Sequence, residues 1–437
     1  AEKRPSFVIG RIARLLPSIS VETESADKEY RLSAKSTALE YAGEHIGGAL
    51  WQYFEEQGDA ERALAAMKDA SRYTRGHLSR DAVHALYGGA VTLSASRMDM
   101  ARSCHFAYFM RYGLKARERT GAGFDAPQIG TFVHDVMEHT LRQAKECGGL
   151  HTLSKDKLHA LVRASIEEYI DRVLPDLCEK SARFRYLFNR LCAAVERIMD
   201  EVSEELQSSD FEPLAFELEF GADGQLPAIT IREENGTARV VGKVDRVDGW
   251  LHNGKLYLRV VDYKTGKKSF DLAELRYGLG LQMLLYLFTL KEEGQMLFGG
   301  HEIVPAGVLY TPAREPMLRC ARDTEPEKIE KALKKELRRS GMVLEDPAVL
   351  QAMEHSALES PCYLPIAVKR DGAVTGSLAS AEQLGKLSKY VDHILHEITQ
   401  EVFAGNIDAD PYARTPQQSA CTYCEFASAC HFENGCG

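Results

Sequence analysis

Apolar side chains recur at helical spacing in four segments of the chain. These segments are residues 46–54, 60–67, 158–173 and 184–202. Residues three and four apart lie on one helix face, so each segment is predicted to be an amphipathic helix. We therefore expect a helical region over residues 1–93 and a helical insertion at about 150–210. Two further helices are expected, one capped by Ser96 and one over about 128–145.

A different pattern begins at about residue 211. Phenylalanine and leucine alternate with glutamate over residues 216–220, which is typical of a strand with one buried face. We expect two more strands after it, then a helix over about 275–293 and a strand near 306–310. Strands set among helices predict an α/β core.

The two expected strands flank the dipeptide Asn253-Gly254. They are residues 238–251 and 255–263. Asn-Gly strongly favours a two-residue hairpin turn, because both central positions of that turn need a positive φ. With this loop, His252 faces Lys255, and the remaining residues pair in order away from the turn.

In that register Asp245 lies opposite Asp262, with Cβ atoms roughly 4.5–5.5 Å apart on one face. Two facing carboxylates repel, but they converge well on a hard divalent cation, which prefers oxygen ligands. Lys264 emerges two residues later on the same face. Such a set suits phosphodiester hydrolysis, in which metals activate a water and a lysine offsets negative charge. A lone Asp-x-Lys triplet is also common on a surface hairpin with scattered charges.

Two helical pairs could support this site. Gln282 and Tyr286 lie one turn apart on a strongly apolar helix, so both polar groups share a face. His134 and Glu138 have the same spacing on the helix expected over 128–145. A lone helical histidine is more often structural than a metal ligand, and Glu138 has no role that the pattern requires.

Composition limits the class of protein. With 437 residues, 44% hydrophobic and 27% charged, the chain is typical of a globular protein of two or three domains. The longest apolar stretch, 279–290, is too short to span a bilayer, so no membrane segment is expected. The first residues lack a signal-peptide pattern and begin with Ala1, so we expect an intracellular piece of a longer protein. No GxxxxGK[ST] phosphate loop occurs, and ATP hydrolysis by this chain alone is not expected.

The net charge of −10 does not favour nucleic-acid binding, because DNA is held by Lys and Arg side chains that neutralise phosphates. A DNA-binding surface would therefore have to be local. The basic runs are Arg111, Lys115, Arg117 and Arg119, and Lys264, Lys267 and Lys268. Such runs are equally typical of a solvated face.

Ten cysteines are too few for a disulfide scaffold, and six of them are scattered. Cys421, Cys424 and Cys430 lie close together in CTYCEFASAC, and Cys104 is the candidate for a fourth ligand. Cys436 and His431 are weaker candidates. Four thiolates hold either zinc or an iron–sulfur cluster, and the spacing alone does not decide between them.

Taken together, four segments resemble the RecB-like branch of the PD-(D/E)xK nuclease superfamily. They are GTFVH (130–134), GKVDRVD (242–248), VDYKTG (261–266) and QMLLY (282–286). The resemblance runs from about residue 94 to the end of the chain, although Val244 stands where the family usually has proline. It implies a central mixed sheet and large helical insertions.

By the same resemblance, His134, Asp245 and Asp262 bind one or two Mg²⁺ ions with the carbonyl of Tyr263. Lys264 is catalytic. Gln282 and Tyr286 support the site or the DNA.

One cysteine upstream and C-x₂-C-x₅-C downstream of such a nuclease look like the iron–sulfur nuclease domain of AddB-type subunits of bacterial helicase–nucleases. That resemblance implies a structural 4Fe-4S cluster on the four cysteines. It also implies an AddA-type helicase–nuclease partner in the bacterial cytoplasm, and an exonuclease that processes double-strand DNA ends for recombinational repair by cutting the 5′-ended single strand.

On this interpretation the chain is the C-terminal portion of such a subunit. Residues 1–93 end an upstream helicase-like region, and residues 94–437 form the nuclease domain. Two alternatives stay open. One is a stand-alone RecB- or Cas-type iron–sulfur single-strand nuclease, and the other is a non-catalytic DNA-binding clamp.

Overall fold

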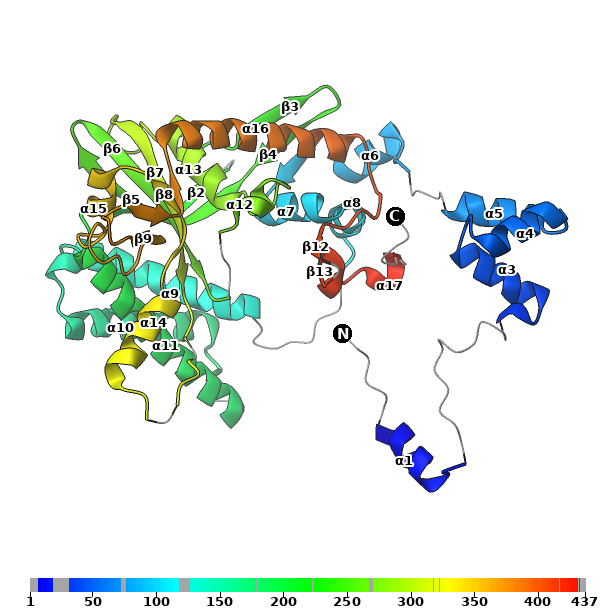
Figure 1. Ribbon diagram of the computed structural model, residues 1–437. Helices are drawn as coiled ribbons and strands as arrows, with labels where there is room; N and C mark the ends of the chain where they lie inside the picture. Colours follow the sequence, from blue (N-terminus) through cyan, green and yellow to red (C-terminus); the bar gives the residue numbers. More distant parts are fainter. Residues whose placement is uncertain are drawn as a thin grey trace. The chain divides into compact units, whose positions relative to one another are not determined.

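The computed structural model divides the chain into two compact units, which are described separately (Figure 1). One contains residues 1–75 and 433–437, and the other contains residues 76–432. The structure describes residues 7–18, 31–71, 76–117, 126–177, 180–221, 224–266, 270–316, 318–321, 323–415, 417–430 and 432. Arg119, Cys178, Lys267, Lys268, His431 and Cys436 therefore lie outside the described residues.

The described part of the first unit is helical, as the sequence predicted for residues 1–93. Its helices are α1 (Phe7–Leu15), α3 (Lys35–Glu44), α4 (Ala49–Gln57) and α5 (Glu61–Ser71). Trp51 and Phe54 from α4 pack with Leu64 of α5 in a small core of their own. Helix α4 ends at Gly58, whose φ of 70° is a left-handed conformation that glycine adopts without a steric cost.

The second unit is built on a six-stranded sheet with strand order β11-β8-β7-β6-β5-β2. The strands are β2 (Glu212–Phe220), β5 (Gly242–His252), β6 (Lys255–Lys264), β7 (Glu302–Pro312), β8 (Ser340–Leu344) and β11 (Leu378–Ala379). Strands β2, β5 and β6 pair antiparallel, and β6 pairs parallel with β7. The sheet is therefore mixed, and the predicted α/β class is confirmed.

The β5–β6 hairpin has the predicted turn and register. Asn253 and Gly254 have φ values of 50° and 75°, as a two-residue turn requires. His252 pairs with Lys255, and the pairs continue in order to Arg246 with Val261. Asp245 and Asp262 are the next residues outward on the two strands, at the edge where β6 ends.

Helices cover both faces of this sheet. Helices α9 (Ala126–Glu146), α10 (Lys155–Val173) and α11 (Ala182–Gln207) cover one face, and α13 (Gln282–Glu293) and α16 (Ala381–Phe403) cover the other (Figure 1). Helices α10 and α11 form the predicted insertion. No helix in the described parts of the chain is long and apolar enough to cross a membrane.

The other helices are α6 (Arg80–Tyr87), α7 (Ala95–Ser103), α8 (His105–Tyr108), α12 (Leu272–Leu275), α14 (Pro326–Glu336), α15 (Pro347–Met353) and α17 (Ala427–Cys430). The short helices of other types are η2 (Phe109–Gly113), η3 (Leu150–Thr152) and η5 (Ala420–Tyr423). The remaining strands are β1 (Ala90–Leu93), β3 (Ile229–Glu233), β4 (Gly236–Val240), β9 (Ile366–Val368), β10 (Val374–Gly376), β12 (Ala413–Thr415) and β13 (Gln418–Ser419). Strand β1 pairs parallel with β4, so the expectation of helices up to residue 93 was wrong for residues 90–93, which join the second unit as a strand.

Two predicted helix starts were wrong. The helix expected from about residue 275 begins at Gln282, because Gly278 and Gly280 have φ values of 77° and 68° and interrupt it. The helix expected to be capped at Ser96 begins at Ala95, with Ser94 in the cap position.

Candidate active site

Asp262 and Lys264 lie at the end of β6, where the strand leaves the sheet. The Nζ atom of Lys264 is 2.6 Å from Oδ2 of Asp262, which is only 3% exposed. Burial and the nearby charge of Asp245 raise the pKa of Asp262 to about 6, although Lys264 and His134 oppose the shift. The raised pKa means that the anionic form of Asp262 is destabilised here in spite of the neighbouring Lys264 ammonium group.

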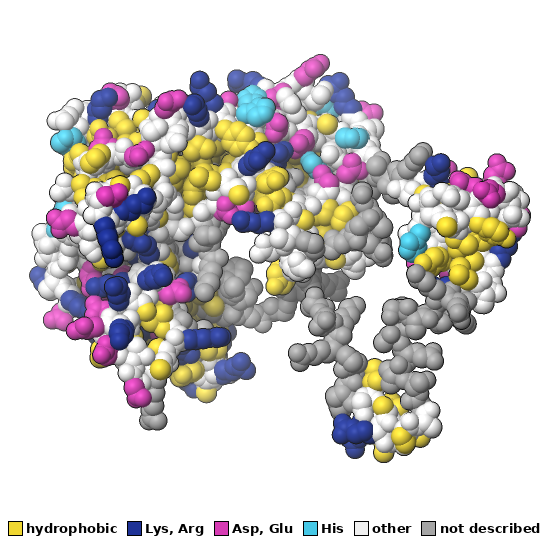
Figure 2. Space-filling view, in the orientation of Figure 1, with side chains coloured by type: hydrophobic (Ala, Val, Ile, Leu, Met, Phe, Trp, Pro, Cys, Tyr) yellow, Lys and Arg dark blue, Asp and Glu magenta, His cyan; other side chains and the backbone are white. Residues whose placement is uncertain are grey.

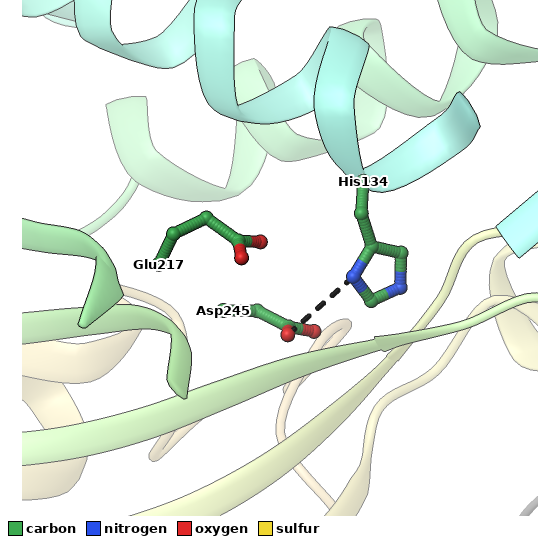
Figure 3. A group of neighbouring side chains, drawn as sticks. All are labelled: His134, Glu217 and Asp245. Carbon is green, nitrogen blue, oxygen red and sulfur yellow. Dashed lines mark ion pairs between the residues drawn. The ribbon is translucent and has the colours of Figure 1, made fainter. Parts of the chain in front are cut away.

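Asp245 and His134 lie beside Asp262 and Lys264 at the same end of the strands. Oδ2 of Asp245 accepts a hydrogen bond from the backbone N–H of Tyr263 at 2.8 Å, and its Oδ1 is 3.4 Å from Nδ1 of His134 (Figure 3). Nε2 of His134 lies 2.9 Å from the carbonyl oxygen of Tyr263. Burial lowers the pKa of His134, but Asp245 and the Tyr263 carbonyl outweigh it and raise this pKa to about 9.

Glu217 belongs to the same group, and the sequence analysis missed it. Its carboxylate, Asp245 and His134 have ligand atoms that lie within 4.8 Å of one another, and among the described residues no other set of three or more His, Cys, Asp or Glu does so (Figure 3). Burial raises the pKa of Glu217, while Lys243, with Nζ 2.5 Å away, lowers it. Glu217 has a φ of 50°, which is uncommon for a residue with a side chain and is enriched at functional sites.

The other helical candidates lie around this group. Nε2 of Gln282 donates to the hydroxyl of Tyr286 at 3.2 Å, and both residues line a cleft of about 620 Å³ beside Lys243. Glu138 instead faces Arg142, at 2.8 Å. The structure thus brings His134, Asp245, Asp262, Tyr263 and Lys264 together where β6 ends. Gln282 and Tyr286 line the nearby cleft.

A second set of charged side chains, here called the buried ion cluster, is buried in the second unit. Its members are Glu205, Arg246, Asp248, Arg259 and Arg339, each no more than 3% exposed. Asp248 accepts from Arg259 Nε at 2.8 Å and from Arg246 Nη2 at 3.0 Å. Arg246 Nη1 also donates to the hydroxyl of Tyr263 at 2.7 Å, so the cluster contacts the residue that lies between Asp262 and Lys264.

The four candidate cysteines line a single cavity of about 430 Å³. Cys104 follows α7 in an extended conformation, and burial raises the pKa of its thiol. Cys421, Cys424 and Cys430 come from the segment around η5 and α17. Their convergence on one cavity suits a ligand bound by four sulfurs.

Hydrogen bonds hold the two ends of this unit together beside the cavity. The N–H of Tyr412 donates to the carbonyl of Ser103 at 2.7 Å. Asp410 accepts from the backbone N–H of His105 at 3.0 Å, and its other carboxylate oxygen is 2.5 Å from Nδ1 of His105. The cysteine tail is therefore fixed against the segment that carries Cys104 by contacts besides any bound group.

Known proteins match the chain along almost its whole length. It is 30% identical to the B-type subunit of the ATP-dependent helicase/deoxyribonuclease of Ruminiclostridium cellulolyticum, over 98% of the chain and 39% of that protein. The corresponding subunits of Acetivibrio thermocellus and Caldanaerobacter subterraneus are 32% and 30% identical over the same shares. The chain thus spans about two fifths of the length of these relatives.

The family model of the PD-(D/E)XK nuclease superfamily matches residues 92–431. This range contains every residue of the group at the sheet edge and all four cavity cysteines. The resemblance noted in the sequence is thereby confirmed, and the chain belongs to the PD-(D/E)XK nuclease superfamily.

Proposed function

We propose that this chain is a metal-dependent deoxyribonuclease that acts as an exonuclease on single-stranded DNA. The observation that carries the proposal is the meeting of Asp245, Asp262, Lys264 and His134 at one sheet edge. Buried carboxylates beside an imidazole form a donor set that suits hard divalent cations such as Mg²⁺. Gln282, Tyr286 and Lys243 line a nearby cleft of about 620 Å³, through which a substrate would approach.

His134, Asp245, Asp262, Glu217 and the Tyr263 carbonyl are the residues that would hold one or two Mg²⁺ ions. Bound Mg²⁺ lowers the pKa of a water and neutralises charge on the attacked phosphate. The chain's own residues orient the reaction.

Lys264 is anchored on Asp262, and its ammonium group is placed to offset negative charge on the phosphate as that charge develops. The Gln282–Tyr286 pair presents hydrogen-bonding groups at the cleft, where they can position the DNA backbone. These two contributions need no group beyond the protein and its substrate.

Cleavage of end-labelled single-stranded DNA with Mg²⁺ tests this proposal. Asp262→Asn and Lys264→Gln are expected to lower the rate at least 100-fold, because each removes a charge at the reacting centre. Lys255→Gln is the matched control, since Lys255 lies at the other end of β6 in an exposed pair with Glu302. Wild-type protein that does not cut with Mg²⁺ or Mn²⁺, or an Asp262→Asn variant that cuts normally, would contradict the proposal and favour a non-catalytic clamp.

We also propose that Cys104, Cys421, Cys424 and Cys430 hold a 4Fe-4S cluster with a structural role. Tetrahedral zinc with Zn–S bonds of about 2.3 Å would draw its sulfurs to within roughly 4 Å of one another. Among the described residues no three cysteine sulfurs lie within 4.8 Å of one another, and the four line a wider cavity. This spacing suits a larger group than a single ion.

Iron and zinc analysis of anaerobically purified protein, with the absorbance near 400 nm, tests the cluster. About four irons are expected per chain, by the formula of the cluster. Cys421→Ala is expected to lose them, whereas Cys147→Ala, an exposed free cysteine, is the control and keeps them. Stoichiometric zinc in place of iron would overturn this assignment.

The similarity to helicase/deoxyribonuclease subunits supports a wider proposal. We propose that the chain is the C-terminal part of such a subunit, that it works with an AddA-type helicase–nuclease partner in the bacterial cytoplasm, and that it cuts the 5′-ended strand of double-strand ends during recombinational repair. Residues 1–93 would then end the upstream helicase-like region. Duplexes labelled on one strand at a time, digested by a complex reconstituted with a partner whose own nuclease site has been inactivated, test the polarity. Equal cleavage of both strands, or activity that never depends on a partner, would favour a stand-alone nuclease.

A further inference from the structure

Helix α11 carries a row of arginines on its exposed face. Arg183, Arg190 and Arg197 are spaced seven residues apart, which is close to two helical turns, so their side chains lie along one line. Arg190 and Arg197 are 58% and 55% exposed. Tyr186 lies between the first two arginines on this face and is 61% exposed. The row spans about 21 Å at 1.5 Å per residue.

The other side of α11 explains why this face is held outward. Phe188, Val195 and Met199 are buried in the main core. The Phe188 ring lies 5.0 Å from that of Phe132, two residues before His134 on α9. The arginine row is therefore fixed in orientation by packing that also positions the active-site histidine.

One end of the row reaches the edge of the sheet that carries Lys264. Arg197 Nη2 lies 2.7 Å from the Glu315 carboxylate, and Arg190 Nη2 lies 3.4 Å from it. Glu315 follows closely on Pro312, which pairs with Lys264 across β6 and β7. The row of arginines therefore begins near the strand ends that carry the proposed catalytic residues. It extends away from them along α11.

The row concentrates positive charge on a chain of net charge −10. Residues 182–197 contain four arginines and a single acidic residue, Glu196, which is paired with Arg163. Arg183 makes no ion pair with any residue that the structure describes. Exposed ion pairs such as those with Glu315 contribute little and give way to a stronger anion. In Figure 2, several Lys and Arg side chains lie in the region of α11 and α14, with Asp and Glu side chains among them.

We infer that this exposed face of α11 binds the single-stranded DNA substrate beside the active site. Arg183, Arg190 and Arg197 contact phosphates spaced along the strand, and Tyr186 stacks on a base. A basic track with an interposed aromatic ring is the combination by which proteins hold single strands without reading their sequence. The inference rests on the proposed function for its choice of ligand. The basic run that includes Arg111 offers less, since Arg111 is only 33% exposed in its pair with Glu425, whereas Arg190 and Arg197 are more than half exposed.

Fluorescence anisotropy with a labelled oligothymidine, measured in EDTA at several salt concentrations, tests the track without cleavage. Arg183→Gln/Arg190→Gln is expected to weaken binding and to reduce the slope of log K against log salt by about 1.4, or about 0.7 for each phosphate contact. Tyr186→Ala is expected to weaken binding roughly 5- to 150-fold, as loss of one base–aromatic stack does.

Arg232→Gln/Arg239→Gln is the matched control, with the same charge change on exposed positions of β3 and β4. It is expected to leave the slope unchanged, and thermal unfolding checks that each variant is folded. Unchanged affinity and slope in the α11 variants, or an equal loss in the control, would overturn the track. A wild type that binds as expected but never cuts DNA would overturn the proposed nuclease activity and leave the track standing.

Discussion

Replacing Glu205 with glutamine removes one charge from the buried ion cluster and changes the shape of the side chain little. Glu205 is 1% exposed, and its Oε2 accepts from Arg339 at 2.6 and 3.0 Å. Its Oε1 is 3.3 Å from Nη2 of Arg259 and 3.9 Å from Nη2 of Arg246. Three arginines therefore depend on this carboxylate and on Asp248 for their compensation.

The pKa of Glu205 gives the size of the effect. Burial by itself raises the pKa of a carboxyl group, but the three arginines outweigh it and lower the pKa of Glu205 from 4.5 to about 2. A shift of this size corresponds to about 3 kcal/mol of stabilisation at neutral pH. Removing one partner of a buried ion pair costs about 3–5 kcal/mol, which is the same scale.

The pH dependence follows from the sign of that shift. Because the folded pKa lies below the unfolded one, the stabilisation is fully present above pH 4.5 and is lost as the pH falls toward 2. The Glu205→Gln variant lacks it at every pH. The difference in unfolding free energy between wild type and variant is therefore expected to be about 3 kcal/mol at pH 7 and to shrink below pH 4.5.

Urea unfolding followed by tryptophan fluorescence measures this difference. The chain has two tryptophans, Trp51 in the first unit and Trp250 in the second, so a Trp51→Phe background reports the second unit alone. Glu302→Gln, in an exposed pair with Lys255, is the control and is expected to cost less than about 0.5 kcal/mol. A cost below about 1 kcal/mol for Glu205→Gln at pH 7, or a difference that persists unchanged at pH 3, would refute the reasoning.

Three further variants extend the same unfolding assay. Asp410→Asn weakens the bonds to His105 and is expected to cost about 1 kcal/mol and to speed the loss of iron; unchanged iron retention would count against a role in holding the cysteine tail. Gly242→Ala places a Cβ atom 2.6 Å from Cε1 of Tyr286, so a cost of about 1–3 kcal/mol and slower DNA cleavage are expected; normal cleavage would show that Tyr286 need not hold its position. Gly385→Ala in α16 meets no atom within 4 Å and is expected to stabilise the protein by about 0.5–1 kcal/mol, and any loss of stability would contradict that.

The hairpin could be predicted from the sequence because local chemistry determines it. Asn253 and Gly254 are the residues that tolerate the two positive φ values, and the two-residue loop leaves only one register. The neighbourhood of Asp245, Asp262 and Lys264 follows from that register and from side-chain alternation. These steps need no knowledge of the rest of the fold.

Glu217 and the buried ion cluster could not be predicted in the same way. Glutamates that alternate with phenylalanine and leucine indicate a solvent-facing side of a strand, and nothing local marks the positive φ that places Glu217 by Asp245. Nothing local in the sequence marks Arg246 and Arg259 as buried either. Their burial depends on Glu205, which comes from a helix far away in the chain.

The buried ion cluster is linked to the candidate active site through Tyr263. Tyr263 lies between the two sets: its N–H donates to Asp245, its carbonyl faces His134, and its hydroxyl accepts from Arg246. Three arginines against two carboxylates leave a net positive charge behind the strands that carry Asp245 and Asp262. At low effective dielectric this charge offsets part of the repulsion between the two carboxylates. An alternation of the proposed metal-binding acids with buried cations would keep these acids close together without a metal, and would reduce the rearrangement that metal binding requires.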